Sequence, residues 1–268
     1  MIAVLGAGAF GTALAVSHAR EGTPVLLWGR NADAMADMAR TRTNEKRLPQ
    51  IELPELLEPT PDLSRAIKAD TILLAVPTQQ TGGFLAQNAA ALAGKTLVSC
   101  SKGVDRSTLE GPSTLIAAHC PSATAAVLTG PSFAVDIARG LPTALTLACA
   151  ADTAAGLQHE LSNATLRIYL TNDLTGAELG GALKNVVAIA CGVTIGAGLG
   201  ESARAAVMTR GFAEMQRLAM ALGALPETLS GLSGFGDLAL TCTSEKSRNL
   251  RFGLSLGREE GFDTGATT

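Results

Sequence analysis

The sequence MIAVLGAGAFG, Met1–Gly11, decides the fold of this chain. The apolar run Ile2–Leu5 predicts a buried strand, and Thr12–Arg20 continues with the spacing of a helix. Three glycines between them fall on the pattern G-x-G-x-x-G, namely Gly6, Gly8 and Gly11. A strand, a tight turn and a helix in this order predict a dinucleotide site, with the first free N–H groups of the helix facing the phosphates.

Each glycine of the motif has a separate expected task. Gly6 permits the turn, Gly8 lets the backbone approach a pyrophosphate, and Gly11 lets the helix pack closely on the strand. A secretory signal peptide is the competing interpretation of residues 1–19. It is disfavoured because the segment has no basic start and its apolar core is interrupted by glycines.

The composition describes a globular chain with room for two domains. The 268 residues are 47% hydrophobic and 17% charged. A net charge of −3 and an aromatic content of 3% disfavour a nucleic-acid or anionic-membrane partner, so any phosphate ligand needs local cations. The longest later uncharged run, residues 185–200, is too short and glycine-rich to predict membrane insertion. The five cysteines lack metal-ligand or redox spacing, which predicts reduced thiols, no metal site and a cytoplasmic protein.

A second strand, Thr23–Trp28, is followed by Gly29 and Arg30. Sites that prefer NAD carry an Asp or Glu near this point to hold the ribose diol. A guanidinium instead suits a 2′-phosphate, so Arg30 predicts a preference for NADPH. A solvated arginine at a strand end is the alternative.

Further along the chain, strands alternate with helical segments, which predicts a parallel, doubly wound sheet. After a helix at Ala32–Arg40 we expect a proline-bearing loop, because four prolines occur between residues 49 and 61. The later strands are expected at Thr71–Val76, Thr96–Ser101, Ala125–Thr129, Thr143–Ala148 and Thr165–Leu170. From Asn172 onward the spacing is helical. We therefore predict an α/β fold, with a Rossmann-type dinucleotide-binding domain at residues 1–175 and an all-helical substrate domain at residues 176–268.

Three residues follow strands at the edge where ligands of such sheets bind. Lys102 could meet a phosphate or a carbonyl oxygen, or be an ordinary surface lysine. Gly130 forms a turn with Pro131, and Ser132 could donate to a ligand or cap the next helix.

The helix expected at Asp173–Ile195 is apolar nearly all round, which predicts burial. Its glycines suggest close approach of another backbone or of a ligand. Lys184 is the one charge on its small-residue stripe, and desolvation should lower the pKa of this amine. It is a candidate general acid and base, with a structural ion pair as the alternative.

Two segments near the end of the chain add polar groups to this helical region. A second helix, Ser202–Leu222, has an apolar face that we assign to the core, with Gly223 as its C-cap. The run Ser247, Arg248, Asn249 offers a hydroxyl, a guanidinium and an amide, which suits a phosphate clamp. A solvated helix end is the alternative.

Together these segments resemble the soluble bacterial glycerol-3-phosphate dehydrogenase family, which uses NAD(P). The resemblance extends over essentially the whole chain. Its motifs are GAGAFG at 6–11, LWGR at 27–30, SKG at 101–103, TGPSFA at 129–134, GLPTA at 140–144, ELGGALKNV at 178–186, TRG at 209–211, GFGDLALTC at 234–242 and SRN at 247–249.

The resemblance implies interconversion of dihydroxyacetone phosphate and sn-glycerol 3-phosphate with NADPH or NADH, supplying phospholipid synthesis. It implies that Lys184 is the catalytic proton donor and acceptor. The substrate would be held by Lys102, Gly130, Ser132, Lys184, Asp237, Ser247, Arg248 and Asn249. The cofactor would contact the glycine turn with Ala9 and Phe10, and also Arg30, Lys102, Ala134 and Arg248. A homodimer is left open.

Members of this family normally continue with a V-x-E-G-type segment and closing helices, so we expect the helical domain to be incomplete at Thr268. Two alternatives stay open. One is an NADP-dependent hydroxyacid or ketopantoate-type reductase, in which residues 247–249 would grip a carboxylate. The other is a catalytically silent NADP(H) sensor.

Overall fold

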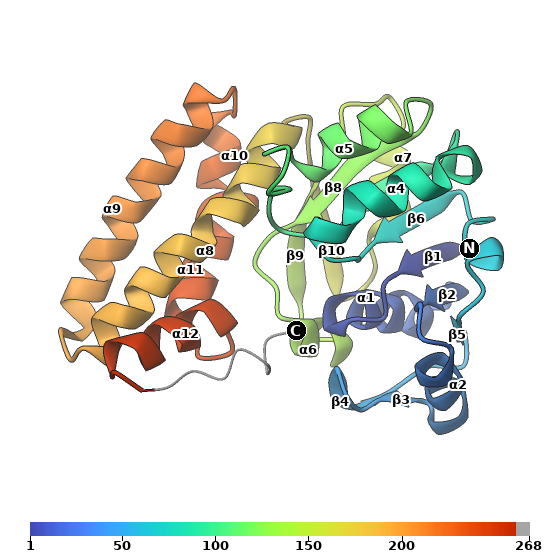
Figure 1. The fold of residues 1–268 in the computed structure, drawn as a ribbon, viewed down its shortest axis with the longest axis horizontal. Helices are drawn as coiled ribbons and strands as arrows, with labels where there is room; N and C mark the ends of the chain where they lie inside the picture. The colour runs from blue at the N-terminus through green and yellow to red at the C-terminus, as the bar shows by residue number, and fades with distance from the viewer. Residues whose placement is uncertain (261–268) are drawn as a thin grey trace. The chain divides into compact units, whose positions relative to one another are not determined.

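The computed structural model describes residues 1–260, and the chain divides into two compact units. The first unit runs from Met1 to Leu174 and the second begins at Thr175. The first unit contains all the strands among the described residues, whereas the described part of the second unit is built of helices (Figure 1). The predicted α/β class, with a Rossmann-type sheet followed by helices, is confirmed.

An eight-stranded sheet forms the centre of the first unit, in the order β10-β9-β8-β7-β6-β1-β2-β5. Its strands are β1 (Ile2–Leu5), β2 (Val25–Trp28), β5 (Leu57–Thr60), β6 (Thr71–Leu74), β7 (Thr96–Ser99), β8 (Thr124–Thr129), β9 (Thr143–Ala148) and β10 (Leu166–Thr171). The glycine motif follows β1, which pairs in parallel with β2 on one side and β6 on the other. The motif therefore lies at the carboxyl end of a central strand, where ligands of such sheets bind.

The sheet is mixed, so the prediction of an all-parallel sheet is wrong at one place. β9 runs antiparallel to β8, with Val127 opposite Ala148 and Thr129 opposite Thr146, while β10 is parallel to β9. Residues 130–142 connect β8 to β9 and contain one short helix, α6 (Ala134–Ala138). A parallel connection has to return along the full length of β8 before the next strand can begin. An antiparallel strand can begin close to the point where β8 ends.

The expected proline-bearing loop is also corrected. Residues 41–61 contain a two-stranded antiparallel pair, β3 (Thr43–Asn44) with β4 (Leu48–Glu52), and the edge strand β5 of the main sheet. Pro59 lies within β5, opposite Leu27 of β2. An edge strand tolerates proline because one side of its backbone has no neighbouring strand to receive an N–H.

Helices cover both faces of the sheet. One face packs under α1 (Ala9–Arg20), α2 (Ala32–Thr41), α6 and α7 (Ala154–Leu161), and the other under α3 (Leu63–Ala66), α4 (Thr78–Leu92) and α5 (Pro112–His119). Figure 1 shows α4 and α5 side by side on their face. Each face of the sheet forms its own hydrophobic core with the helices that cover it. Side chains of β1 alternate between the two cores, with Ile2 and Val4 in one and Ala3 and Leu5 in the other.

The described part of the second unit consists of α8 (Leu174–Gly196), α9 (Gly200–Ala221), α10 (Pro226–Ser230), the π-helical turn η1 (Leu232–Gly236), α11 (Asp237–Thr243) and α12 (Arg248–Gly257). Glycines let α8 and α12 approach backbone to backbone. A Cβ on Gly192 would lie 2.8 Å from the Gly253 Cα, and a Cβ on Gly253 would lie 2.9 Å from the Gly192 Cα. The glycines of α8 predicted the close approach of a backbone or a ligand. At Gly192 it is the backbone of α12 that approaches.

The apolar faces of the long helices are less buried than predicted. On α9, Met215 lies in the core, but Leu218 is 49% exposed, and Leu222, the C-cap that follows the helix, is 57% exposed. On α8, the small-residue stripe with Lys184 is buried, whereas Val193 is 36% exposed. Periodicity identifies which residues share a face but not whether another element covers it. By length and hydropathy α8 alone among the described helices could cross a membrane, a property that it shares with core helices of soluble proteins.

Candidate functional site

The glycine turn meets the steric requirements of a dinucleotide motif. Gly6 has a φ of +124°, and a Cβ there would lie 2.5 Å from the Ala75 carbonyl oxygen. A Cβ on Gly11 would overlap the Gly6 carbonyl and lie 2.9 Å from the Ala75 Cβ. A Cβ on Gly8 would meet nothing within 4 Å, and Gly8 itself is exposed. Two glycines therefore allow close packing, and the third opens the backbone to a ligand.

The start of α1 is available to an anion. Gly8 is the N-cap of α1 and provides no side-chain cap for the first turn. Asn44 holds the turn from behind, because its Nδ2 donates to the Ala7 carbonyl at 3.1 Å and to the Thr12 hydroxyl at 2.8 Å. Phe10 packs against the core beneath, and Ala9 is partly exposed at the first helical position. The backbone N–H groups at this end of the helix suit a phosphate.

Arg30 lies two residues beyond β2 and its side chain is exposed. Its Nη1 donates to the Gln80 Oε1 at 3.4 Å. The preceding Gly29 packs closely against α2, since a Cβ there would lie 2.7 Å from the Met35 Cε. The guanidinium is thus held close to the carboxyl ends of β2 and β6, on either side of the glycine turn.

Lys102, Gly130 and Ser132 meet at one carbonyl group. The Lys102 Nζ donates to the Gly130 oxygen at 2.9 Å, and the Ser132 Oγ donates to the same oxygen at 3.3 Å. Gly130 has a φ of +137°, which a side chain would strain. Ala134 begins α6, which packs beside α1. The structure thus brings these predicted residues together at the carboxyl ends of β7 and β8.

In the second unit, Lys184 forms a buried polar cluster. Its Nζ donates to the Asp237 Oδ1 and to the Thr241 Oγ1, both at 2.8 Å. The Thr241 hydroxyl donates to the Asp237 carbonyl oxygen at 2.6 Å. The side chains of Lys184 and Asp237 are only 8% and 1% exposed. The carboxylate and the hydroxyl together hold the Lys184 amine in one orientation.

Glycines also determine how Asp237 reaches this cluster. The turn η1 presses against α8, because a Cβ on Gly180 would collide with the Ser233 carbonyl. A Cβ on Gly234 would likewise collide with the Leu229 carbonyl. This tight turn ends directly before Asp237, the first residue of α11. The spacing of the GFGD motif thus delivers a carboxylate to the lysine of another helix.

The run Ser247, Arg248, Asn249 forms the start of α12. Ser247 is buried and is the N-cap, since its Oγ accepts from the Leu250 N–H at 3.2 Å. Arg248 is exposed at the first helical position. The Asn249 Nδ2 donates to the Asn185 Oδ1 at 2.7 Å, and Asn185 directly follows Lys184 in the sequence. A cation at a helix N-terminus is an arrangement that binds anions.

Thr241 and Asn185 belong to these clusters but were not predicted as site residues. Thr241 lies four residues after Asp237, so both lie on one face of α11, and this spacing could have identified it. Asn185 follows Lys184 directly, but its pairing with Asn249 spans 64 residues and leaves no local signal.

The chain matches two family models that together cover most of its length. A model of the NAD-dependent glycerol-3-phosphate dehydrogenase N-terminus matches residues 1–155, and a model of the C-terminus of the same enzyme matches residues 173–267. The chain belongs to the NAD-dependent glycerol-3-phosphate dehydrogenase family. The resemblance noted from the motifs is therefore confirmed, and with it the oxidoreductase class and a nicotinamide cofactor.

Individual members of the glycerol-3-phosphate dehydrogenase family are similar over nearly the whole chain. The glycerol-3-phosphate dehydrogenase [NAD(P)+] of Paracoccus denitrificans (strain Pd 1222) is 64% identical over 99% of this chain and 83% of that protein. The one of Ruegeria sp. (strain TM1040) is 61% identical over the same shares. The crystal structure of glycerol-3-phosphate dehydrogenase from Coxiella burnetii superposes with a TM-score of 0.93 at 38% identity, covering 99% of this chain and 82% of that one.

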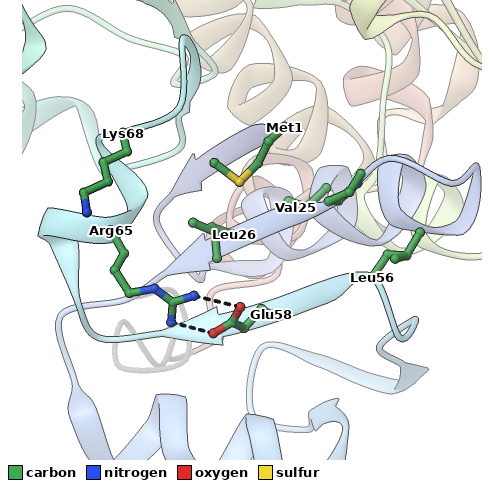
Figure 2. A pocket seen from close by; sticks show the side chains of 8 residues that line it. Met1, Val25, Leu26, Leu56, Glu58, Arg65 and Lys68 are labelled. Carbon is green, nitrogen blue, oxygen red and sulfur yellow. Dashed lines mark hydrogen bonds and ion pairs between the residues drawn. The ribbon is translucent and has the colours of Figure 1, made fainter.

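A small cavity in the first unit lies away from all these residues. It measures about 250 Å³ and is lined by Met1, Pro24, Val25, Leu26, Leu56, Glu58, Arg65 and Lys68. Figure 2 shows Arg65 in a two-bond ion pair with Glu58 at its edge, at 2.6 and 3.0 Å. Met1 and Pro24 directly precede β1 and β2, so the cavity lies at the amino ends of these strands. The glycine turn lies at the opposite, carboxyl end of β1. This cavity contains none of the predicted site residues.

The five cysteines are buried and unpaired, as predicted. Burial raises the pKa of the Cys100 thiol to about 12, so this thiol remains protonated and unreactive. Within residues 1–260, no three His, Cys, Asp or Glu side chains lie close enough to hold a metal ion.

Proposed function

We propose that this chain interconverts dihydroxyacetone phosphate and sn-glycerol 3-phosphate, with Lys184 as the proton donor and acceptor. The family assignment supports the reaction class. The single observation that carries the proposal is the buried cluster of Lys184, Asp237 and Thr241. The product would supply phospholipid synthesis.

The chemistry of this cluster suits a ketone reduction. NADPH supplies a hydride when bound. Reduction of a carbonyl leaves negative charge on its oxygen, and a protonated Lys184 can neutralise this charge and transfer a proton to it. Such general acid catalysis contributes roughly a hundredfold to ten-thousandfold in rate. Asp237 and Thr241 restrict the amine to one orientation, so little reorganisation is needed during the reaction.

We assign phosphate binding to the start of α12. Arg248, the capping Ser247 and Asn249 present a guanidinium, a hydroxyl and an amide at the positive end of a ten-residue helix. Binding energy from a remote phosphate can position the carbonyl group for reaction. Lys102, Gly130 and Ser132 are proposed to complete the substrate site. Lys102 and Arg248 would supply the local cations that a phosphate ligand needs in an acidic chain.

We assign the cofactor to the glycine turn of the first unit. Open space at Gly8 and the uncapped start of α1 suit a pyrophosphate. Ala9, Phe10, Gly6 and Gly11 form this turn, and Ala134 begins a helix beside it. Further cofactor contacts are proposed from Lys102, Arg30 and Arg248. Arg30 would favour NADPH over NADH through a charge-assisted bond to the 2′-phosphate.

Several broader assignments accompany this proposal. Residues 1–175 would act as the dinucleotide-binding domain and residues 176–268 as the substrate domain. We propose a cytoplasmic enzyme whose partner is a small phosphorylated molecule, with a homodimer as the assembly to test.

An initial-rate assay of the 268-residue chain tests the proposal. We expect oxidation of NADPH with dihydroxyacetone phosphate, and much slower oxidation with 2-keto acids. A preference for 2-keto acids would favour a hydroxyacid or ketopantoate-type reductase. Tight NADPH binding without turnover of any of these substrates would favour a nucleotide sensor.

A further inference from the structure

We propose that Gln80 is a second determinant of cofactor specificity, which acts by positioning Arg30. The inference rests on the proposed role of Arg30 at the 2′-phosphate. The Arg30 Nη1 donates to the Gln80 Oε1 at 3.4 Å. Both side chains are exposed. A hydrogen bond in water contributes little to the stability of the fold, so its main effect is on where the guanidinium lies.

The bond joins the loop after β2 to the start of α4, one on each side of the glycine turn. Leu5, the last residue of β1, is paired with Trp28 of β2 on one side and with Leu74 of β6 on the other. Arg30 follows β2, and Gln80 lies in the first turn of α4, which follows β6. The Arg30–Gln80 bond therefore connects the two sides of the carboxyl end of β1, where the cofactor is proposed to bind.

An aromatic contact joins the end of β2 to α4. The rings of Trp28 and Phe84 lie 5.8 Å apart at an interplanar angle of 43°. Trp28 is two residues before Arg30, and Phe84 is one helical turn after Gln80. The Trp28 Nε1 also donates to the Pro61 carbonyl at 3.0 Å, which fixes the indole ring. The meeting of Arg30 and Gln80 thus follows from the packing of α4 on β2.

The chemistry of the amide explains how it would affect specificity. A glutamine side chain is neutral, with one carbonyl acceptor and an amino group that donates. It can orient Arg30 while leaving the positive charge uncompensated for a 2′-phosphate. A carboxylate at the same position would pair with Arg30, repel the phosphate and offer an acceptor to a ribose hydroxyl, as the acidic residue of NAD-preferring sites does. Gln80 therefore favours NADPH.

The neighbouring glutamine provides a matched control. The Gln79 Nε2 donates to the Val104 carbonyl at 2.8 Å, and the Gln79 Oε1 accepts from the Arg106 backbone N–H at 3.1 Å. Gln79 has the same chemistry and exposure, but it contacts the loop after β7 instead of Arg30. Substitution of Gln79 tests the effect of disturbing the start of α4 in general.

The experiment compares dissociation constants for NADPH and NADH by fluorescence titration of the full chain. Variants Gln80→Glu, Gln80→Leu, Arg30→Ala, Arg30→Ala/Gln80→Leu and Gln79→Leu are measured beside the wild type, each checked for folding by circular dichroism. Gln80→Glu should lower the preference for NADPH at least tenfold, and Gln80→Leu about threefold. The effect of Gln80→Leu should disappear when Arg30 is absent, because Gln80 acts through Arg30. Gln79→Leu should leave the preference unchanged.

Two results would overturn the inference while leaving the proposed role of Arg30 intact. One is a result in which Arg30→Ala lowers the preference for NADPH over NADH, while Gln80→Glu and Gln80→Leu keep the preference of the wild type. The other is an equal effect of Gln80→Leu with and without Arg30. An unchanged preference in Arg30→Ala itself would overturn the role of Arg30 and the inference together, yet leave the assignment of Lys184 to catalysis untouched.

Discussion

The substitution Gly8→Ala separates the fold of the glycine turn from its capacity to bind the cofactor. Gly8 has φ −74° and ψ 178°, which alanine adopts without strain, and the added Cβ meets nothing within 4 Å. Alanine is a poorer N-cap than glycine by about 0.5–1 kcal/mol. It also reduces the entropy of the unfolded chain, which stabilises by about 0.4–1 kcal/mol. The free energy of unfolding should therefore change by less than about 1 kcal/mol.

Cofactor binding should respond very differently to the same methyl group. The methyl would project into the open space through which a pyrophosphate reaches the N–H groups at the start of α1. A lost charge-assisted hydrogen bond costs about 1.5–3 kcal/mol. This corresponds to roughly 10- to 150-fold in affinity for each bond. We expect the dissociation constant for NADPH to rise at least about tenfold.

Gly11→Ala is the matched control, and it should lower the free energy of unfolding, which Gly8→Ala should leave nearly unchanged. Its Cβ would overlap the Gly6 carbonyl and crowd the Ala75 Cβ at 2.9 Å, and such overpacking costs about 1–3 kcal/mol. Urea unfolding followed by circular dichroism gives the stabilities, and fluorescence titration gives the NADPH affinities. If Gly8→Ala bound NADPH as tightly as the wild type, the assignment of the pyrophosphate to this turn would be refuted.

Three further predictions concern the interior. Asp237→Ala should destabilise the chain by about 3–5 kcal/mol in urea unfolding, because it leaves the Lys184 ammonium buried without its carboxylate, and a loss below 1 kcal/mol would contradict this. Burial lowers the pKa of His18 from 6.5 to about 4, so stability present above pH 6.5 should be lost as the pH falls toward 4, by about 3 kcal/mol. His18→Gln should flatten the pH dependence of unfolding over this interval, and an unchanged slope would be evidence against the buried neutral imidazole. Gly253→Val should lower the melting temperature by several degrees, since its side chain would force α12 away from Gly192, and an unchanged value would contradict the close packing.

The parts of the fold with strong local patterns were predictable from the sequence. The glycine spacing after β1 predicted the turn, and the apolar run Ile2–Leu5 predicted a buried strand. Gly223 has a φ of +93° just beyond α9, as its predicted capping role requires. In each case a residue type is tied to a backbone conformation within a few positions, so no distant part of the chain needs to be known.

The parts that escaped prediction depend on distant partners. Pro59 made a strand improbable until its place at the sheet edge was known. The composition of Thr143–Ala148 says nothing about strand direction, which becomes known only from its antiparallel pairing with β8. Leu218 belongs to the predicted apolar face of α9, but its exposure depends on whether another element packs against that face.

The candidate site shows the same division. Lys184 stood out because a single charge on a small-residue stripe is unusual. The local pattern alone could not pair it with Asp237 and Thr241, since these residues lie 53 and 57 positions away. Arg30 was identified from its place after a strand, whereas its contact with Gln80 arises only when the sheet order places β6 and β2 on either side of β1.

The most direct test of the account is the turnover of dihydroxyacetone phosphate by Lys184→Met, compared with its affinity for NADPH. The account predicts that turnover falls by at least about a hundredfold. The dissociation constant for NADPH should stay within about threefold of the wild type, since the glycine turn belongs to the other unit. Turnover close to that of the wild type in a folded Lys184→Met chain would contradict the account.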